Sequence, residues 1–287
     1  MPGIMQNTDK SGGAGSEGHA TRVPKRFDRF ARLVGGPAVA KLMRSHIAVI
    51  GLGGVGSYVA EGLARSGVGR LTLVDFDEVC VTNFNRQLHA VEGAIGKAKV
   101  ELMAARVKAI NPKLEVNAPK IFYEKSAADR ILVPAPDMVI DCIDNVTAKL
   151  HLLWTCVERK IPAITCLGAS AKLDPTRVKV VPLPDTHTDP LGQALRKNLR
   201  RKYKMPDTDM EKITAVFSDE PLIWPDPNYR GTLCGVECVC PNGENPHHTC
   251  KKRHVIHGSS VFVTATFGMA AASEAVRVLT GLRAVPL

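Results

Sequence analysis

The residues with the clearest chemical meaning form a glycine-rich segment between an apolar run at 46–50 and a helical pattern at 55–66; its glycines are Gly51, Gly53, Gly54 and Gly56. Glycines let a backbone approach a phosphate closely, and the start of the following helix favours negative charge. Asp75 ends the next apolar run, 71–74. A carboxylate there can accept hydrogen bonds from ribose hydroxyls. These residues predict a nucleotide site; a glycine turn that only packs strand against helix is the plainer alternative.

A polar segment from Asp75 to Gln87 follows. It helps to decide which class of nucleotide-binding protein this is. A nicotinamide-dependent oxidoreductase has only to hold a pyrophosphate. An enzyme that attacks the α-phosphate of ATP must also stabilise the leaving pyrophosphate, which requires converging cations and amide donors. We predict Arg86 and Lys99 as the catalytic cations, although either could form a surface ion pair. Asp77 and Asn83 are predicted to bind the nucleotide with them. A nicotinamide enzyme and a non-catalytic nucleotide-binding module are therefore disfavoured.

Two carboxylates follow the apolar run at 138–140, namely Asp141 and Asp144. Ligands of open α/β sheets bind at the carboxyl ends of the strands. A carboxylate at this place could hold a Mg²⁺ ion that bridges the phosphates. We assign Asp144 to Mg²⁺ and Asp141 to structure, although the Asp144-Asn145 pair could also cap the helix that follows.

The pattern of apolar residues predicts the strands and helices that would position these residues. Short apolar runs at 46–50, 71–74, 114–116, 138–140 and 161–166 alternate with helical patterns at 55–66, 97–110 and 147–159. Such alternation predicts an α/β fold with a doubly wound, mostly parallel, Rossmann-like sheet. Runs at 178–181 and 214–217 extend that sheet by a partly antiparallel portion, and 261–272 reads as a buried helix. A helical pattern also covers 26–42.

Composition limits the organisation of the 287 residues. Residues 1–22 are rich in Gly, Ser and charge and are predicted to be a disordered tail. Residues 23–287 are predicted to be one domain with an insertion at about 218–257. No apolar run is long enough for a membrane span, so we expect no membrane partner. No secretory signal is recognised and eight cysteines are present, which favours a reducing, cytoplasmic setting.

The net charge of +10 is concentrated in residues 196–204, which contain no acid. This segment belongs to a helical pattern at 190–204, and its cations cannot share one face. Phosphate contacts supply most of the affinity of proteins for nucleic acid, so the segment could bind an RNA. A merely solvated basic helix is the alternative. The cations are Arg196, Lys197, Arg200, Arg201, Lys202 and Lys204.

The glycine segment, Asp75, the block from Asn83 to Gln87, Lys99 and the block from Asp141 to Asn145 together resemble the ubiquitin-activating superfamily. That superfamily includes the adenylyltransferases of molybdopterin and thiamine biosynthesis. The resemblance implies ATP and Mg²⁺ as cofactors and a homodimer, in which an arginine of the N-terminal helix reaches the ATP of the partner subunit. Arg29 matches that arginine, with Arg32 as the second candidate.

The second half of the chain resembles one branch, the tRNA threonylcarbamoyladenosine dehydratases. The resemblance is carried by the segments at 168–180, 188–191, 216–221 and 261–268. It implies that ATP activates the carboxylate of a threonylcarbamoyl group on the tRNA adenosine beside the anticodon, and that ring closure then releases AMP. The alternative within the superfamily is an enzyme that activates the C-terminus of a ubiquitin-like or sulfur-carrier protein, and a partner of that kind would then be expected.

A cysteine cluster lies in the predicted insertion and consists of Cys234, Cys238, Cys240 and Cys250. The spacing is not the paired Cys-x2-Cys of common zinc modules, yet four thiols around a turn could close a tetrahedral Zn²⁺ site. Redox-active thiols and a catalytic thiol remain alternatives. The stretch before Val261 lacks the cysteine that some of these dehydratases carry, so a covalent cysteine intermediate is not supported. Cys80, Cys142, Cys156 and Cys166 lie in apolar runs and are predicted to be core thiols.

Overall fold

The computed structural model describes residues 23–229 and 257–282. In these residues one sheet runs through the molecule in the order β3-β2-β1-β4-β5-β7-β6. All neighbours are parallel except β6 and β7, which are antiparallel. The predicted α/β class with a mostly parallel sheet and an antiparallel extension is confirmed. The strands are β1 (His46–Ile50), β2 (Arg70–Val74), β3 (Glu115–Asn117), β4 (Met138–Asp141), β5 (Ala163–Cys166), β6 (Val178–Pro182) and β7 (Ile213–Ser218).

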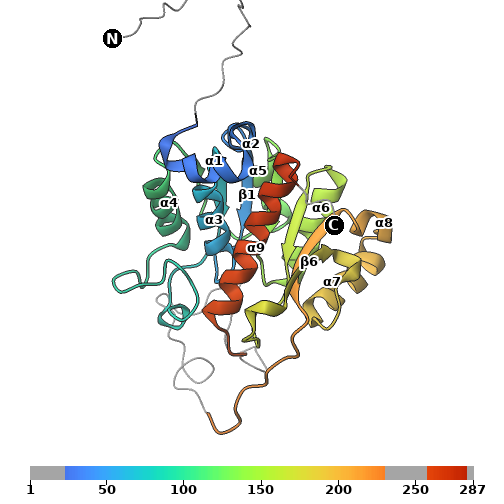
Figure 1. Ribbon diagram of the computed structural model, residues 1–287. Coiled ribbons are helices and arrows are strands. Elements are labelled where there is room, and N and C mark those ends of the chain that lie inside the picture. The colour runs from blue at the N-terminus through green and yellow to red at the C-terminus, as the bar shows by residue number, and fades with distance from the viewer. Residues whose placement is uncertain (1–22, 230–256, 283–287) are drawn as a thin grey trace, which may run out of the picture.

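Helices cover both faces of the sheet (Figure 1). Alternate strand residues face opposite sides, so each face has its own apolar core. One core includes Val49 and Leu71 and is covered by α3, α4 and α9. The other includes Ile50 and Phe217 and is covered by α5, α6 and α7. The helices are α1 (Asp28–Val34), α2 (Gly36–Leu42), α3 (Gly56–Arg65), α4 (Lys99–Ile110), α5 (Ala128–Leu132), α6 (Val146–Glu158), α7 (Pro190–Lys202), α8 (Asp207–Met210) and α9 (Val261–Thr280).

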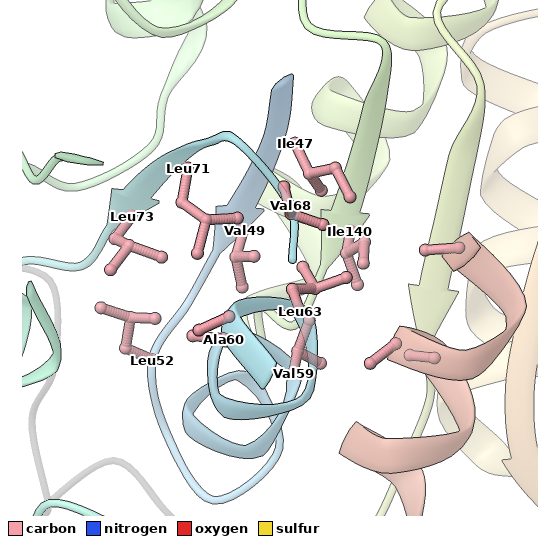
Figure 2. Packing of buried hydrophobic residues seen from close by; sticks show 14 of the residues in the cluster. Ile47, Val49, Leu52, Val59, Ala60, Leu63, Val68, Leu71, Leu73 and Ile140 are labelled. Carbon is pink, nitrogen blue, oxygen red and sulfur yellow. The ribbon is translucent and has the colours of Figure 1, made fainter. Parts of the chain in front are cut away.

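The contact between α3 and the centre of the sheet positions the glycine segment. Leu63 and Val59 of α3 pack against Val49 and Ile140 (Figure 2), and these side chains are fully buried. Burying each such side chain stabilises the fold by about 1.5–3 kcal/mol. The start of α3 is thereby fixed at the carboxyl ends of β1 and β4.

The N-terminal helical segment is broken, contrary to the single helical pattern predicted for 26–42. A short 3-10 turn (Lys25–Phe27) is followed by α1 and α2, which meet at Gly35. Gly35 has φ +89° and ψ 148°. This backbone conformation interrupts a right-handed helix, and residues other than glycine rarely adopt it. The direction of the chain therefore changes between α1 and α2.

Helix α9 extends beyond the predicted run at 261–272 and continues to Thr280. By length and composition alone it could cross a membrane, but half of its apolar stretch is buried inside the molecule. Phe267 and Ala271 lie in the core beside α3, as the prediction of a buried helix requires. This pattern is typical of the core helix of a globular protein.

The predicted domain organisation is only partly covered by the structure. The same sheet receives strands from both halves of the chain, so the described residues contain no second sheet. The tail at 1–22 and most of the insertion at 218–257 lie outside the described residues. Their predicted character therefore stays a prediction.

Candidate functional site

The glycine segment links β1 to α3, and its glycines are required by close approaches. Gly51 has φ +92°, and a Cβ there would lie 2.8 Å from the carbonyl oxygen of Cys142. A Cβ at Gly56 would lie 1.8 Å from the carbonyl oxygen of Gly51. No side chain fits either place, so the backbone can turn tightly at the start of α3. Backbone N–H groups at such a helix start suit a phosphate ligand.

Asp75, at the end of β2, fastens this glycine segment. Its carboxylate accepts hydrogen bonds from the backbone N–H of Leu52, at 2.6 Å, and of Asp77, at 2.8 Å. Burial raises the pKa of Asp75, while the nearby Lys99 ammonium lowers it. Because a carboxylate can accept about four hydrogen bonds, the two backbone bonds leave room for a ribose hydroxyl. The predicted contact with the ribose stays a prediction.

Lys99 is brought to the same place by the first turn of α4. Its ammonium Nζ lies 2.9 Å from Oδ2 of Asp77, and only 4% of the residue is exposed. The Asp77 side chain is 29% exposed, so this ion pair reaches solvent at one side. A lysine held in this way presents a positive charge with little conformational freedom. That arrangement suits the stabilisation of a negative group in the opening.

Arg86 lies beside the glycine segment. A Cβ built on Gly54 would be 3.2 Å from Cγ of Arg86. The Arg86 guanidinium donates hydrogen bonds to the Thr82 carbonyl at 2.8 Å and to Oδ1 of Asn85 at 2.9 Å. Asn83 shapes this turn, since its Oδ1 accepts a hydrogen bond from the backbone N–H of Cys80 at 3.0 Å. The aliphatic part of Arg86 therefore lies against Gly54, while its guanidinium is hydrogen-bonded within its own turn.

Two neighbours of Arg86 were not among the predicted site residues, Gln87 and His89. They are 7% and 5% exposed, yet Oε1 of Gln87 and both ring nitrogens of His89 lack hydrogen-bond partners among the described residues. A Cβ on Gly53 would lie 4.0 Å from Nε2 of Gln87. Burial lowers the pKa of His89 to about 4, assisted by the charge of Lys99. Buried polar atoms without partners are uncommon and mark this place as a ligand-facing one.

The end of β4 contains a buried ion pair and an exposed carboxylate. Asp141 and Lys149 are both fully buried, with Nζ 2.8 Å from Oδ2, and Thr165 donates a further hydrogen bond to Asp141. Burial raises the pKa of Asp141 and Lys149 lowers it. This agrees with the structural role predicted for Asp141. Asn145 caps α6 by accepting a hydrogen bond from the Ala148 backbone N–H at 3.1 Å, while Asp144 is exposed.

Two groups of cations from the sequence analysis lie elsewhere. Arg29 is exposed on α1, at the edge of the sheet opposite the glycine segment (Figure 1). There Arg26 donates to the Ile110 carbonyl at the end of α4, at 2.8 Å, and Arg32 pairs with Asp28 at 2.9 Å. Within one subunit Arg29 is therefore far from the candidate site. The basic residues of α7 lie on the helix that packs against α6, on the flank of the sheet.

The predicted Zn²⁺ cluster cannot be placed, because all four of its cysteines lie outside the described residues. Within residues 23–229 and 257–282, no three His, Cys, Asp or Glu side chains are grouped as a metal site. The four predicted core thiols form no disulfide among the described residues; Cys80, Cys156 and Cys166 are buried and Cys142 is half-buried. A structural Zn²⁺ at Cys234, Cys238, Cys240 and Cys250 therefore stays a prediction.

The fold and the glycine segment define a Rossmann-like nucleotide-binding protein, with two cations beside the expected phosphate position. The ThiF family model matches residues 27–286, and the chain belongs to this family. It is 42% identical over 254 residues to the tRNA threonylcarbamoyladenosine dehydratase of Haemophilus influenzae, covering 88% of this chain and 92% of that protein. The corresponding Escherichia coli protein is 39% identical over 256 residues, covering 88% and 92%.

A solved structure agrees with these sequence relatives. The crystal structure of E. coli tRNA N6-threonylcarbamoyladenosine dehydratase in complex with ATP matches with a TM-score of 0.76 and 35% identity. The match covers 90% of this chain and 95% of that chain. Both halves of the present chain therefore have counterparts in that enzyme.

Proposed function

We propose that this protein uses ATP to dehydrate threonylcarbamoyladenosine in tRNA by adenylating the threonyl carboxylate. One observation carries the proposal: Arg86 lies against Gly54, and the Lys99 ammonium lies near Asp75, whose carboxylate binds the Leu52 backbone N–H of the glycine segment. A nicotinamide enzyme has no need for these two cations. Membership of the ThiF family and the names of relatives that match along most of the chain support the same reaction.

The first step is transfer of an adenylyl group. A carboxylate oxygen of the threonyl group attacks the α-phosphorus of ATP, the bond to the bridging oxygen of the β-phosphate breaks, and pyrophosphate leaves. In the second step the neighbouring urea group attacks the activated carbonyl, AMP leaves, and the ring closes with loss of a proton. The sum is removal of one water from the nucleoside, driven by cleavage of ATP.

The chain's own residues would act mainly through charge and position. Lys99, oriented by Asp77, and Arg86 would stabilise the negative charge that develops on the departing pyrophosphate. The backbone N–H groups after Gly51 would bind phosphate oxygens at the start of α3. Asp75 would hold both the glycine segment and the ribose. Gln87 would complete the contact at Gly53.

Mg²⁺ fits the carboxylate at Asp144. This residue is exposed just after β4, and the preceding Cys142 backbone touches Gly51, so it lies beside the proposed phosphate position. Mg²⁺ characteristically keeps several waters and takes one or two carboxylates together with substrate phosphates. A single protein ligand therefore agrees with that ion. Bound there, it would neutralise phosphate charge.

A homodimer would give Arg29 a role. This side chain is exposed and lies away from the glycine segment of its own subunit, so it could contact ATP only in a second subunit. Mixing an Arg29→Ala variant with a Lys99→Ala variant should restore part of the activity through hybrid dimers. An active protein that is strictly monomeric by light scattering would contradict this role.

Pyrophosphate release from ATP tests the proposed function. We expect stimulation by tRNA carrying threonylcarbamoyladenosine and none by unmodified tRNA. The alternative, activation of a ubiquitin-like or sulfur-carrier protein, predicts stimulation by a carrier protein that ends in Gly-Gly. That result, without stimulation by modified tRNA, would replace the proposal. The tRNA substrate and the free thiols among the described cysteines both fit the cytoplasm.

A further inference from the structure

Helix α7 runs from the carboxyl ends of the strands toward their amino ends. It begins beside the carboxyl end of β5, where Asp189 caps it by accepting a hydrogen bond from the Gly192 backbone N–H at 2.7 Å. A Cβ on Gly192 would lie 2.8 Å from the side chain of Leu167, directly after β5. After α7 the chain passes through α8 to Ile213, which pairs with Ala163 at the amino end of β5. Helix α7 therefore runs antiparallel to β5.

The last turn of α7 is consequently distant from the proposed ATP site. A helix rises about 1.5 Å per residue, so residues 200–202 lie about 15–18 Å from its start. Figure 1 shows α7 along the flank of the sheet, with α8 next to it. The basic segment cannot surround the nucleotide whose carboxylate reaches the glycine segment. The RNA contacts expected for this segment would therefore be made to phosphates away from that nucleotide.

The cations of this segment differ in what they contact. Arg196 is half-buried and donates to the Thr186 hydroxyl, and Arg200 pairs with Asp207 at 2.7 Å. The remaining cations are exposed and have no carboxylate within ion-pair distance in the part of the chain that the structure describes. They form the outer cation cluster: Lys197, Arg201, Lys202 and Lys204.

Aromatic rings lie next to this cluster, at the junction of α6 and α7. The rings of Trp154 and Tyr203 have centroids 5.5 Å apart, and His151 lies 5.9 Å from Trp154. All three side chains are half-buried. Exposed cations beside aromatic rings are the combination with which proteins commonly bind RNA. An acidic protein partner would not require the rings.

We propose that the outer cation cluster binds tRNA phosphates outside the anticodon loop, while the target adenosine occupies the opposite edge of the sheet. This inference rests on the proposed function, because it takes tRNA as the substrate. The cluster then contributes to the affinity for the tRNA and not to the chemical step. An RNA shortened to the anticodon stem-loop would lack those phosphates.

The experiment compares two doubly substituted proteins. Arg201→Glu with Lys202→Glu reverses the charge of the cluster, and Lys108→Glu with Lys113→Glu reverses two exposed cations at the far side of the sheet. Modified full-length tRNA and a modified anticodon stem-loop are the substrates. For the cluster variant we expect kcat/KM with full-length tRNA to fall at least tenfold through KM, and activity on the stem-loop to stay unchanged. The control variant should match the wild type on both.

Binding of full-length tRNA in the absence of ATP is measured separately against salt concentration. Each lost phosphate contact should reduce the slope of log K against log salt by about 0.7–0.9. A slope equal to that of the wild type, or an equal loss on both RNAs, would overturn the proposed surface. The wild type could show the steeper salt dependence of tRNA binding and yet release no pyrophosphate with modified tRNA. That result would support the proposed surface and contradict the proposed reaction.

Discussion

Two lysine–aspartate pairs at the same edge of the sheet differ in their access to solvent. Lys149 and Asp141 are 2.8 Å apart, and both side chains are 0% exposed. Lys99 and Asp77 are 2.9 Å apart, but the Asp77 side chain is 29% exposed. The first pair is enclosed between α6 and the sheet, whereas the second opens toward the glycine segment. The same pairing therefore serves the fold in one place and is available to a ligand in the other.

Lys149→Met should have the largest effect, because it leaves the Asp141 carboxylate buried without its counter-ion. We expect the free energy of unfolding to fall by about 3–5 kcal/mol. Urea denaturation without ATP measures this loss. A second variant that adds Asp141→Leu removes the stranded charge and should recover much of the stability. A loss below about 1 kcal/mol in the single variant would show that the pair is not needed for the fold.

Lys99→Met should act on the reaction instead. Turnover is expected to fall by at least about 100-fold, or roughly 2.7 kcal/mol of transition-state stabilisation. Arg86→Ala should lie in the same range. Water can solvate the partly exposed Asp77, so the thermal stability should change little. Lys108→Met, an exposed position on the same helix, is the control for α4 and should keep full activity; a Lys99 variant equally active would remove Lys99 from the site.

His89 offers a pH test of the same edge. Its pKa is lowered to about 4 in the folded protein, while an unfolded histidine titrates near 6.5. Only the unfolded chain binds the proton between these values, so stability is complete above pH 6.5 and is lost as the pH falls toward 4. At pH 5 this term amounts to about 2 kcal/mol. His89→Leu should flatten the dependence of the unfolding free energy on pH between 7 and 5; equal slopes would contradict the buried neutral ring.

Arg159→Ala should have the smallest effect. Arg159 and Asp129 are only 2.6 Å apart, closer than either lysine–aspartate pair, but their side chains are 35% and 80% exposed. We expect a loss of less than about 1 kcal/mol in urea denaturation, because water already solvates both charges. A loss as large as that of Lys149→Met would mean that proximity, and not burial, decides the importance of these pairs.

Much of the fold was predictable because its strands are short, buried and bounded by polar residues. The run at 46–50 coincides with β1, and the run at 178–181 lies within β6. The predicted helix boundaries were wrong where the backbone conformation of one residue ends a helix, as Gly35 does between α1 and α2. The short helices α5 and α8 were not predicted, since segments of four or five residues carry no full helical period.

The candidate site was predictable where residue type and position coincide. Lys99 and Arg86 follow in sequence a glycine segment that needs nearby cations; the structure places Arg86 against Gly54 and Lys99 near Asp75, which binds Leu52. Gln87 and His89 were missed as site residues because amide and imidazole side chains occur in many surroundings. Only their burial without partners distinguishes them.

The sequence by itself determined the order of strands and helices and the chemistry at the carboxyl ends of the strands. Both follow from local rules: apolar periodicity, and glycines where a Cβ would lie only 2.8 Å from a carbonyl oxygen. The tertiary structure alone decided which charges are enclosed and which remain free. Lys149 and Lys99 look alike in the sequence. Helix α6 places Lys149 in a fully buried ion pair, whereas α4 places Lys99 in a pair whose aspartate reaches solvent. Likewise, only the antiparallel course of α7 places its cations at the far edge of the sheet, because distance along a helix becomes distance in space.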